Sequence, residues 1–142
     1  MPAALRVDVF WSFRSPWSYL ATPRLRQWQD EYELELCFRP VYPIAIRTPE
    51  FFRNVDPLWF PYFMTDLRRV AKSWHEGEHL AELDEVAQAE SARLEESIEA
   101  NPAAGHWGVP TCAFEGEPFF GQDRLDVLMW RLRQSGLQRR RA

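Results

Sequence analysis

In the first forty residues, two segments in which apolar and polar residues alternate flank a segment with helical periodicity. This pattern limits which folds the region can form. Apolar side chains occupy every second position of residues 5–11 and again of residues 34–39, which end at Pro40, and a period of two predicts a strand. Residues 16–32 instead place apolar side chains three or four positions apart, as one face of a helix does, and Pro23 is expected to bend that helix. This order predicts two parallel strands joined by a right-handed crossover.

The middle of the chain predicts helices. Residues 40–61 hold five prolines and predict an ordered, irregular connection, and helices are predicted over about residues 62–74 and 79–100. Glutamates cover one face of the second helix, and the nearby His75 and His79 lie at its start, away from ligand spacing on that face. We therefore interpret the acidic face as solvated and predict no metal site.

The last third of the chain predicts a hairpin followed by a helix. Residues 111–115 and 118–120 have the pattern of two short strands, and Gly121 ends the second. Residues 125–132 then place leucine and methionine side chains on one helical face. Together with the two parallel strands, this hairpin predicts an α/β fold with a mixed four-stranded sheet.

Composition excludes several classes of protein. With 46% hydrophobic residues and seven tryptophans among 142 residues, the chain can bury a core in one compact domain. A net charge of −4 argues against a nucleic-acid surface over the whole chain, and the basic stretch "LRQSGLQRRR" is interpreted as a solvated end. We find neither an apolar run of the ~20 residues that span a bilayer nor the pattern of a signal peptide, so no membrane contact is predicted.

Cys37 and Cys112 have neither CxxC nor metal-ligand spacing. Isolated cysteines of this kind are typical of buried, reduced thiols in an intracellular protein. The sequence therefore predicts a cytoplasmic location.

Ser15 stands directly before Pro16, where the first strand gives way to the helix. Proline suits the first helical position, and serine before it is a favoured N-cap, worth about 1 kcal/mol over alanine. The same hydroxyl, at the positive end of the helix dipole, could instead face a bound anion or thiolate. The local pattern favours the cap and leaves the second interpretation open.

Two further motifs bear on ligand binding. Pro110, in the sequence "GVPT", cannot donate a ladder hydrogen bond and marks a strand start or an edge. A cis Val109–Pro110 bond would turn the chain and leave the backbone of Val109 available to a peptide-like ligand. Gln122 and Asp123 open the last helix, where they either cap it or hold a small zwitterion.

Taken with the order of elements, three motifs resemble one enzyme family: "SPWSYLA" after the first strand, "GVPT" before the third, and "GQDRLDVLMWRL" in the last helix. They resemble the glutathione-dependent 2-hydroxychromene-2-carboxylate isomerases, relatives of kappa-class glutathione transferases in the DsbA-like thioredoxin superfamily. The resemblance extends into "RPVYPIAIRTPEFFRNVDPLW". It implies a thioredoxin-like domain from residues 1–46 and 102–142, with Pro110 cis. Residues 47–101 would be a helical insertion, shorter than in family members.

The resemblance implies that the sulfur in the site comes from glutathione. In DsbA-like oxidoreductases the turn at this position carries a reactive cysteine, whereas here it carries Ser15. Ser15 would donate a hydrogen bond to the glutathione sulfur and favour the thiolate, as the catalytic residue. The backbone of Val109 and Pro110 would pair with the cysteinyl part, Gln122 and Asp123 would hold the γ-glutamyl end, and Asn54 lies at a ligand-contacting position.

Two parts of the implied site have no single candidate. Some family members have a lysine near the glycine carboxylate of glutathione. The only lysine in this sequence is Lys72, so we predict that Arg47 or Arg53 binds that carboxylate instead. Six aromatic residues are candidates either for the substrate pocket or for the core, with the core favoured: Trp11, Trp17, Trp59, Phe60, Tyr62 and Phe63.

The implied reaction is isomerisation of an unsaturated, aromatic-derived carboxylate, by reversible addition of the glutathione thiolate. Two alternatives stay open: a kappa-like glutathione transferase or peroxidase, and a non-catalytic glutathione-binding module. The expected partners are therefore glutathione and a small aromatic-derived substrate, and a homodimer is compatible with the sequence.

Overall fold

The computed structural model describes residues 3–12, 14–42, 44–74, 105–106 and 108–141. Its strands are β1 (Leu5–Trp11), β2 (Leu34–Pro40), β3 (Thr111–Phe114) and β4 (Glu117–Phe120). Its helices are α1 (Pro16–Glu31), α2 (Ile44–Arg47), α3 (Phe51–Asn54), α4 (Trp59–Trp74), the 3₁₀ helix η3 (Gln122–Arg124) and α6 (Leu125–Gln134). The helix predicted over residues 79–100 lies outside the described residues, as do His75 and His79.

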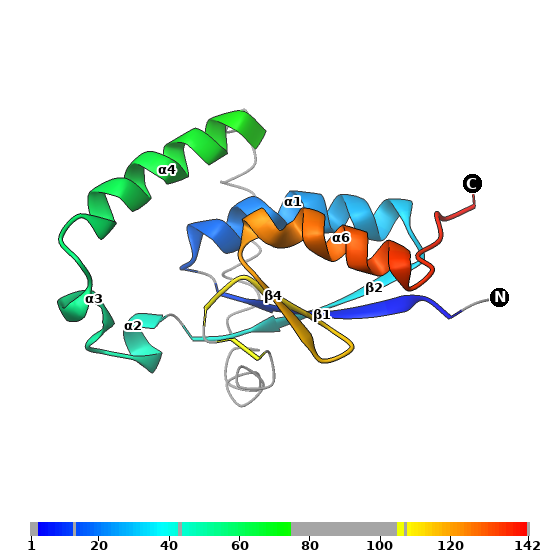
Figure 1. Ribbon diagram of the computed structural model, residues 1–142, viewed down its shortest axis with the longest axis horizontal. Helices are drawn as coiled ribbons and strands as arrows, with labels where there is room; N and C mark the ends of the chain where they lie inside the picture. The colour runs from blue at the N-terminus through cyan, green and yellow to red at the C-terminus, as the bar shows by residue number, and fades with distance from the viewer. Residues whose placement is uncertain (1–2, 13, 43, 75–104, 107, 142) are drawn as a thin grey trace.

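The four strands form one mixed sheet in the order β2-β1-β3-β4. β1 pairs in parallel with β2, and the antiparallel pairs β1–β3 and β3–β4 complete the sheet. Figure 1 shows α1 and α6 together over one face of this sheet, and Arg24 of α1 contacts Asp126 of α6 at 2.5 Å. The predicted mixed four-stranded sheet and its parallel crossover are therefore confirmed.

The main core lies between the sheet and the two helices. Val7 and Val9 on β1, Leu25 on α1, and Leu128 and Leu132 on α6 are all fully buried. Burying a side chain of this size contributes about 1.5–3 kcal/mol. Because these residues come from both ends of the sequence, the core joins the N-terminal and C-terminal segments into one unit.

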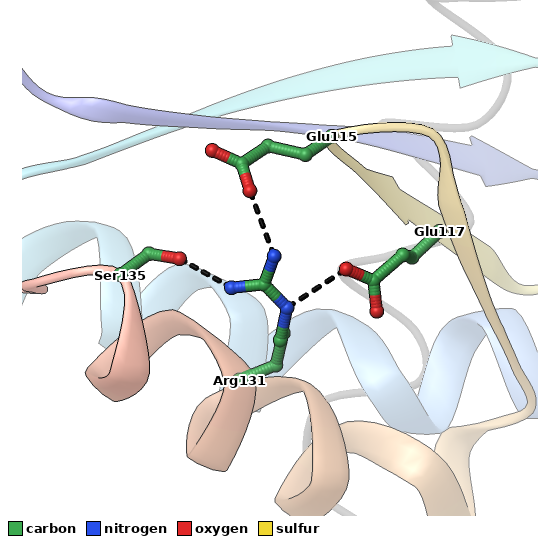
Figure 2. A network of polar contacts seen from close by, with 4 residues as sticks. All are labelled: Glu115, Glu117, Arg131 and Ser135. Atoms are coloured by element: carbon green, nitrogen blue, oxygen red, sulfur yellow. Dashed lines mark hydrogen bonds and ion pairs between the residues drawn. The ribbon is translucent and has the colours of Figure 1, made fainter.

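An arginine on α6 fastens the β3–β4 hairpin to the helix (Figure 2). The Arg131 guanidinium donates hydrogen bonds to Glu117 and Glu115, both at 2.8 Å, and also contacts the hydroxyl of Ser135. The hydrogen bond to Glu117 and the nearby carboxylate of Glu115 raise the pKa of Arg131. This contact ties the turn between β3 and β4 to α6.

The C-terminal segment is only partly the solvated end that the sequence predicts. The side chains of residues 138–141 are exposed, but the backbone amide of Arg140 donates to the carbonyl of Glu31 at 2.8 Å and its guanidinium donates to the carbonyl of Gln29 at 2.9 Å. The last turn of an α-helix leaves its carbonyl groups without partners in the helix. The basic segment supplies donors to that turn of α1.

Three other predictions need correction. The irregular connection predicted over residues 40–61 contains the short helices α2 and α3, and α4 begins at Trp59 rather than near residue 62. Cys37 is half-buried and approaches the Glu35 carboxylate at 3.6 Å, whereas Cys112 is buried as predicted.

Among the described helices, none combines the length and apolar content that crossing a bilayer requires.

Candidate functional site

A cavity of about 600 Å³ lies beyond the carboxyl end of β1. Its walls come from three stretches that are far apart in sequence: residues 12–17, residues 44–63 and residues 108–120. The first contributes Ser12, Arg14, Ser15, Pro16 and Trp17; the second Ile44, Arg47, Phe51, Phe52, Trp59, Phe60 and Phe63; the third Gly108, Val109 and Phe120. The carboxyl ends of strands are common ligand sites in open α/β sheets.

Ser15 caps α1 and lines this cavity. Its backbone is extended (φ −95°, ψ 111°), and its Oγ accepts a hydrogen bond from the amide of Ser18 at 3.2 Å. The predicted N-cap is therefore confirmed. The same hydroxyl lies 3.4 Å from the carbonyl oxygen of Val109 and donates to it. A bond of that length is weak, so the hydroxyl can exchange it for a better acceptor.

The loop before β3 is held on both sides. The amide of Gly108 donates to Nδ1 of His106 at 2.9 Å, and its carbonyl accepts from the Thr111 hydroxyl at 2.6 Å. The carbonyl of Pro110 accepts from the amide of Gly121 at 2.8 Å. This last bond joins the loop to the start of η3.

Val109 lies between Gly108 and Pro110, and its backbone amide has no acceptor among the described residues. The Val109–Pro110 bond is cis, as predicted. The Val109 carbonyl receives the weak bond from Ser15, but within the part of the chain that the structure describes its amide donates to no acceptor. Buried backbone amides of folded proteins are nearly always paired, with protein groups or with ordered water. An unpaired amide in a residue that lines a cavity fits a ligand that carries an acceptor such as a peptide carbonyl.

Of the six aromatic candidates, four line the cavity, namely Trp17, Trp59, Phe60 and Phe63. Their rings pack against one another, with Trp59 stacked on Phe63 at 5.1 Å and Phe63 edge-on to Trp17 at 5.6 Å. Trp11 belongs to the core, as the favoured interpretation had it, and Tyr62 is exposed outside the cavity lining.

The cavity also contains positive charge. Arg47 lines it and donates through Nε to the carbonyl of Tyr42 at 2.6 Å, and burial lowers the pKa of its guanidinium. Arg14 is a second cation in the wall. Arg53, the other arginine predicted for a carboxylate, is exposed outside the lining and pairs with Glu50. A desolvated cation among aromatic rings favours an anionic ligand.

The other predicted binding residues lie outside the cavity lining. Asn54 is exposed at the end of α3. Gln122 is buried, and no donor among the described residues reaches its Oε1, while Asp123 is largely exposed and pairs with Arg124 at 2.9 Å. Neither η3 nor α6 has a side-chain capping bond, so the alternative that Gln122 or Asp123 caps the last helix is wrong.

Sequence reasoning missed several residues of the cavity: Ser12, Arg14, Ile44, Phe51, Phe52, Gly108 and Phe120. For Ser12 and Arg14 a signal was present, because they directly follow the carboxyl end of β1. Phe51 and Phe52 gave none, because their place in the wall depends on how α3 packs.

Comparison with known proteins identifies the family of the fold. A family model described as the DSBA-like thioredoxin domain matches residues 6–81. A solved structure of a 2-hydroxychromene-2-carboxylate isomerase is similar at 23% identity, with a TM-score of 0.65, over 92% of this chain and 95% of the other. A probable DsbA oxidoreductase from Streptomyces coelicolor is similar at 11% identity, with a TM-score of 0.59, over 92% and 89% of the two chains. No protein of curated function matches the chain. The thioredoxin-like fold predicted from the resemblance is confirmed.

Proposed function

The chain belongs to the DSBA-like thioredoxin domain family, whose model matches more than half of it, and on that premise we propose that it binds glutathione beside Ser15. We propose further that it is a glutathione-dependent isomerase of the 2-hydroxychromene-2-carboxylate type. The observation that carries glutathione binding is that Val109 lines the cavity while its amide donates to no acceptor among the described residues. A peptide ligand offers the carbonyl that this amide needs.

The absence of a thiol at the turn supports an external sulfur. Ser15 occupies the start of α1, and neither Cys37 nor Cys112 lines the cavity. Cys112 is also unreactive by its environment, because burial raises the pKa of its thiol from 9.0 to about 12. A sulfur nucleophile at this site therefore comes with the ligand, which also argues against a dithiol oxidoreductase.

The residues around the cavity fit the remaining groups of glutathione unequally. Arg47 offers a desolvated cation for the glycine carboxylate. Gln122 and Asp123 lie outside the cavity lining, so we assign them to the γ-glutamyl end on the resemblance, with the Asp123 carboxylate facing its ammonium. Asn54 stays a proposed contact on the resemblance alone, since it lies outside the cavity lining.

When bound, glutathione would supply a thiolate that adds reversibly to the conjugated system of the substrate. The chain's own part is to keep the proton off that sulfur. The Ser15 hydroxyl would give up its 3.4 Å bond to the Val109 carbonyl and donate to the sulfur instead, which stabilises the charged form. Trp17, Trp59 and Phe63 would exclude water around the reacting atoms.

Calorimetric titration with glutathione tests the binding step, and amide NMR locates it. We expect saturable heat, together with a shift and slower hydrogen exchange at the Val109 amide. Glycine and free glutamate at the same concentration serve as controls and should leave that amide unchanged. Absence of both heat and a Val109 response would rule out the proposed site.

Turnover then separates the reactions. An isomerase regenerates glutathione, a transferase loses free thiol in proportion to product, and a binding module gives no product. We expect product from an unsaturated aromatic-derived carboxylate with the free thiol unchanged at the end of the reaction.

A further inference from the structure

The loop that presents Val109 depends on one imidazole. Thr111 and Gly121, at the ends of β3 and β4, hold two of the loop's carbonyls, and Ser15 donates the weak bond to the Val109 carbonyl. The amide of Gly108, directly before Val109, is held instead by a side chain, Nδ1 of His106 at 2.9 Å. That bond closes a tight turn of the loop onto itself.

The imidazole also packs against the cavity wall. Its ring stacks on Phe120, which lines the cavity, with 3.9 Å between ring centres and 16° between the planes. Gly108 lies against the same ring, because a Cβ at this position would come within 2.3 Å of the Phe120 ring. His106, Gly108 and Phe120 therefore form one packed unit that belongs both to the loop and to the cavity wall.

We propose that His106, as the neutral imidazole, is a positioning residue that holds Val109 ready for the ligand, and that protonation of His106 weakens ligand binding. This inference rests on the proposed binding of glutathione at Val109. An acceptor at Nδ1 exists only in the neutral imidazole, with its proton on Nε2. In the imidazolium both nitrogens are donors, so the Gly108 amide would face an N–H and the turn would open.

The charged groups described around this unit lie on β4, directly after β4, and in the cavity wall, where Arg14 and Arg47 are found. Besides His106, residues 105–110 contain no titratable side chain. On β4, which carries Phe120, the ionisable residue is Glu117, and it pairs with Arg131. Asp123, which follows β4, pairs with Arg124. Histidine side chains in general change their charge between about pH 5 and 8, so the proposal is tested across that range.

Two substitutions separate the hydrogen bond from the stacking. His106→Asn keeps an acceptor, because the Asn Oδ1 is attached to Cγ as Nδ1 is, and it does not titrate. His106→Phe keeps an aromatic ring against Phe120 and removes the acceptor. The probe is S-methylglutathione, whose blocked sulfur does not titrate, measured by calorimetry from pH 5 to pH 8 with melting temperatures as a check on folding.

We expect wild-type affinity to fall about five- to tenfold from pH 8 to pH 5, the effect of losing about one hydrogen bond. His106→Asn should bind about as well as wild type at pH 8 and lose this pH dependence. His106→Phe should bind about five- to tenfold more weakly across the whole range. Wild-type affinity in a folded His106→Phe variant, or an unchanged pH profile in His106→Asn, would overturn the proposal.

A measurement without ligand separates this proposal from the proposed function. Nitrogen NMR of the His106 ring should show the Nε2–H form at neutral pH, and the Gly108 amide should lose protection from exchange as the ring is protonated. If these two signals behave as expected while no glutathione derivative binds, the proposed function fails, but the role of His106 in positioning the loop stands. If the neutral ring carries its proton on Nδ1, the proposed role of His106 is wrong, whatever the protein binds.

Discussion

Ser15 has two roles that substitution can separate. Its Oγ caps α1 through the Ser18 amide and also contacts the Val109 carbonyl at the cavity. Ser15→Ala should raise the pKa of bound glutathione and slow the thiolate-dependent step roughly ten- to a hundredfold, the effect of losing a charge-assisted hydrogen bond of ~1.5–3 kcal/mol. Far-ultraviolet absorbance of the thiolate, titrated against pH, measures the pKa.

Ser15→Gly is the control for the cap. Glycine is nearly as good an N-cap as serine, so this variant should melt close to wild type and yet be as slow as Ser15→Ala. If all three proteins give superimposable thiolate titrations, Ser15 is a cap and nothing more.

Two arginines near α3 form a matched pair for the ligand's carboxylate. Arg47 lines the cavity, whereas Arg53 is exposed outside its lining and pairs with Glu50. Arg47→Gln should weaken glutathione binding roughly tenfold or more, because it removes a partly desolvated cation from its carboxylate. Arg53→Gln should bind as wild type does. Calorimetry measures the glutathione affinity of both variants. An equal loss of affinity in the two would mean that only long-range charge, and not contact with Arg47, contributes to binding.

Cys112 should make the fold sensitive to alkaline pH. Its thiol has a pKa of about 12 in the buried site, raised from 9.0 by desolvation. Between these two values the unfolded chain has released the proton and the folded chain keeps it. The free energy of unfolding should therefore fall as pH rises through this window, by about 1.4 kcal/mol per pH unit, and be unaffected by this group below it.

Urea unfolding of wild type and Cys112→Ala from pH 8 to pH 11 isolates that contribution, since every other ionisable group is common to both proteins. The difference between the two proteins should change with pH above 9. A constant difference would contradict the assignment.

At the scale of elements, the C-terminal segment should stabilise α1. Gln138 accepts from the amide of Glu33 and Arg140 donates to Glu31, both at 2.8 Å, and Leu137 packs against the core. A chain ending at Gly136 should lose about 2–3 kcal/mol of unfolding free energy, from these bonds and the buried apolar surface. A chain ending at Arg140 is the control and should stay within about 0.5 kcal/mol of wild type in urea. Equal stability of the two truncated chains would contradict this role.

Elements were predictable from the sequence where their pattern is local. The alternation of β1 and the periodicity of α1 are set by which face meets the core, so both were placed to within a residue. The start of α4 was missed because Pro61 was interpreted as part of an irregular segment. Proline is tolerated in the first turn of a helix, and here it is the third residue of α4.

The candidate site was predictable only in part. Ser15 and Val109 belong to short motifs and were identified, and the structure brings them within 3.4 Å of each other. Phe51 and Phe52 entered the wall through packing between distant segments. The docking of residues 137–140 on α1 depends on carbonyl groups left open at the end of a helix, which no local pattern of the basic segment reveals.

At the scale of the whole molecule, the cavity should couple binding to global stability. Its walls come from both ends and the middle of the chain, so unfolding of any one part abolishes binding. Glutathione at about 100 times its dissociation constant should add ~2.7 kcal/mol and raise the melting temperature by roughly 10 °C. Hydrogen exchange should slow in both α1 and α6. Slowing in one helix alone would show that the site does not span the fold.

The position of β1 inside the sheet has a consequence for biosynthesis. β1 meets its parallel partner β2 early in the sequence, but its antiparallel partner β3 begins only at Thr111. In a chain that is still being translated, the edge of β1 that pairs with β3 therefore has no partner strand in its own sheet until β3 has been made. Open edges of this kind template association with other chains. From the end of β2 to the start of β3, about half of the sequence, the nascent protein depends on that edge finding no other strand.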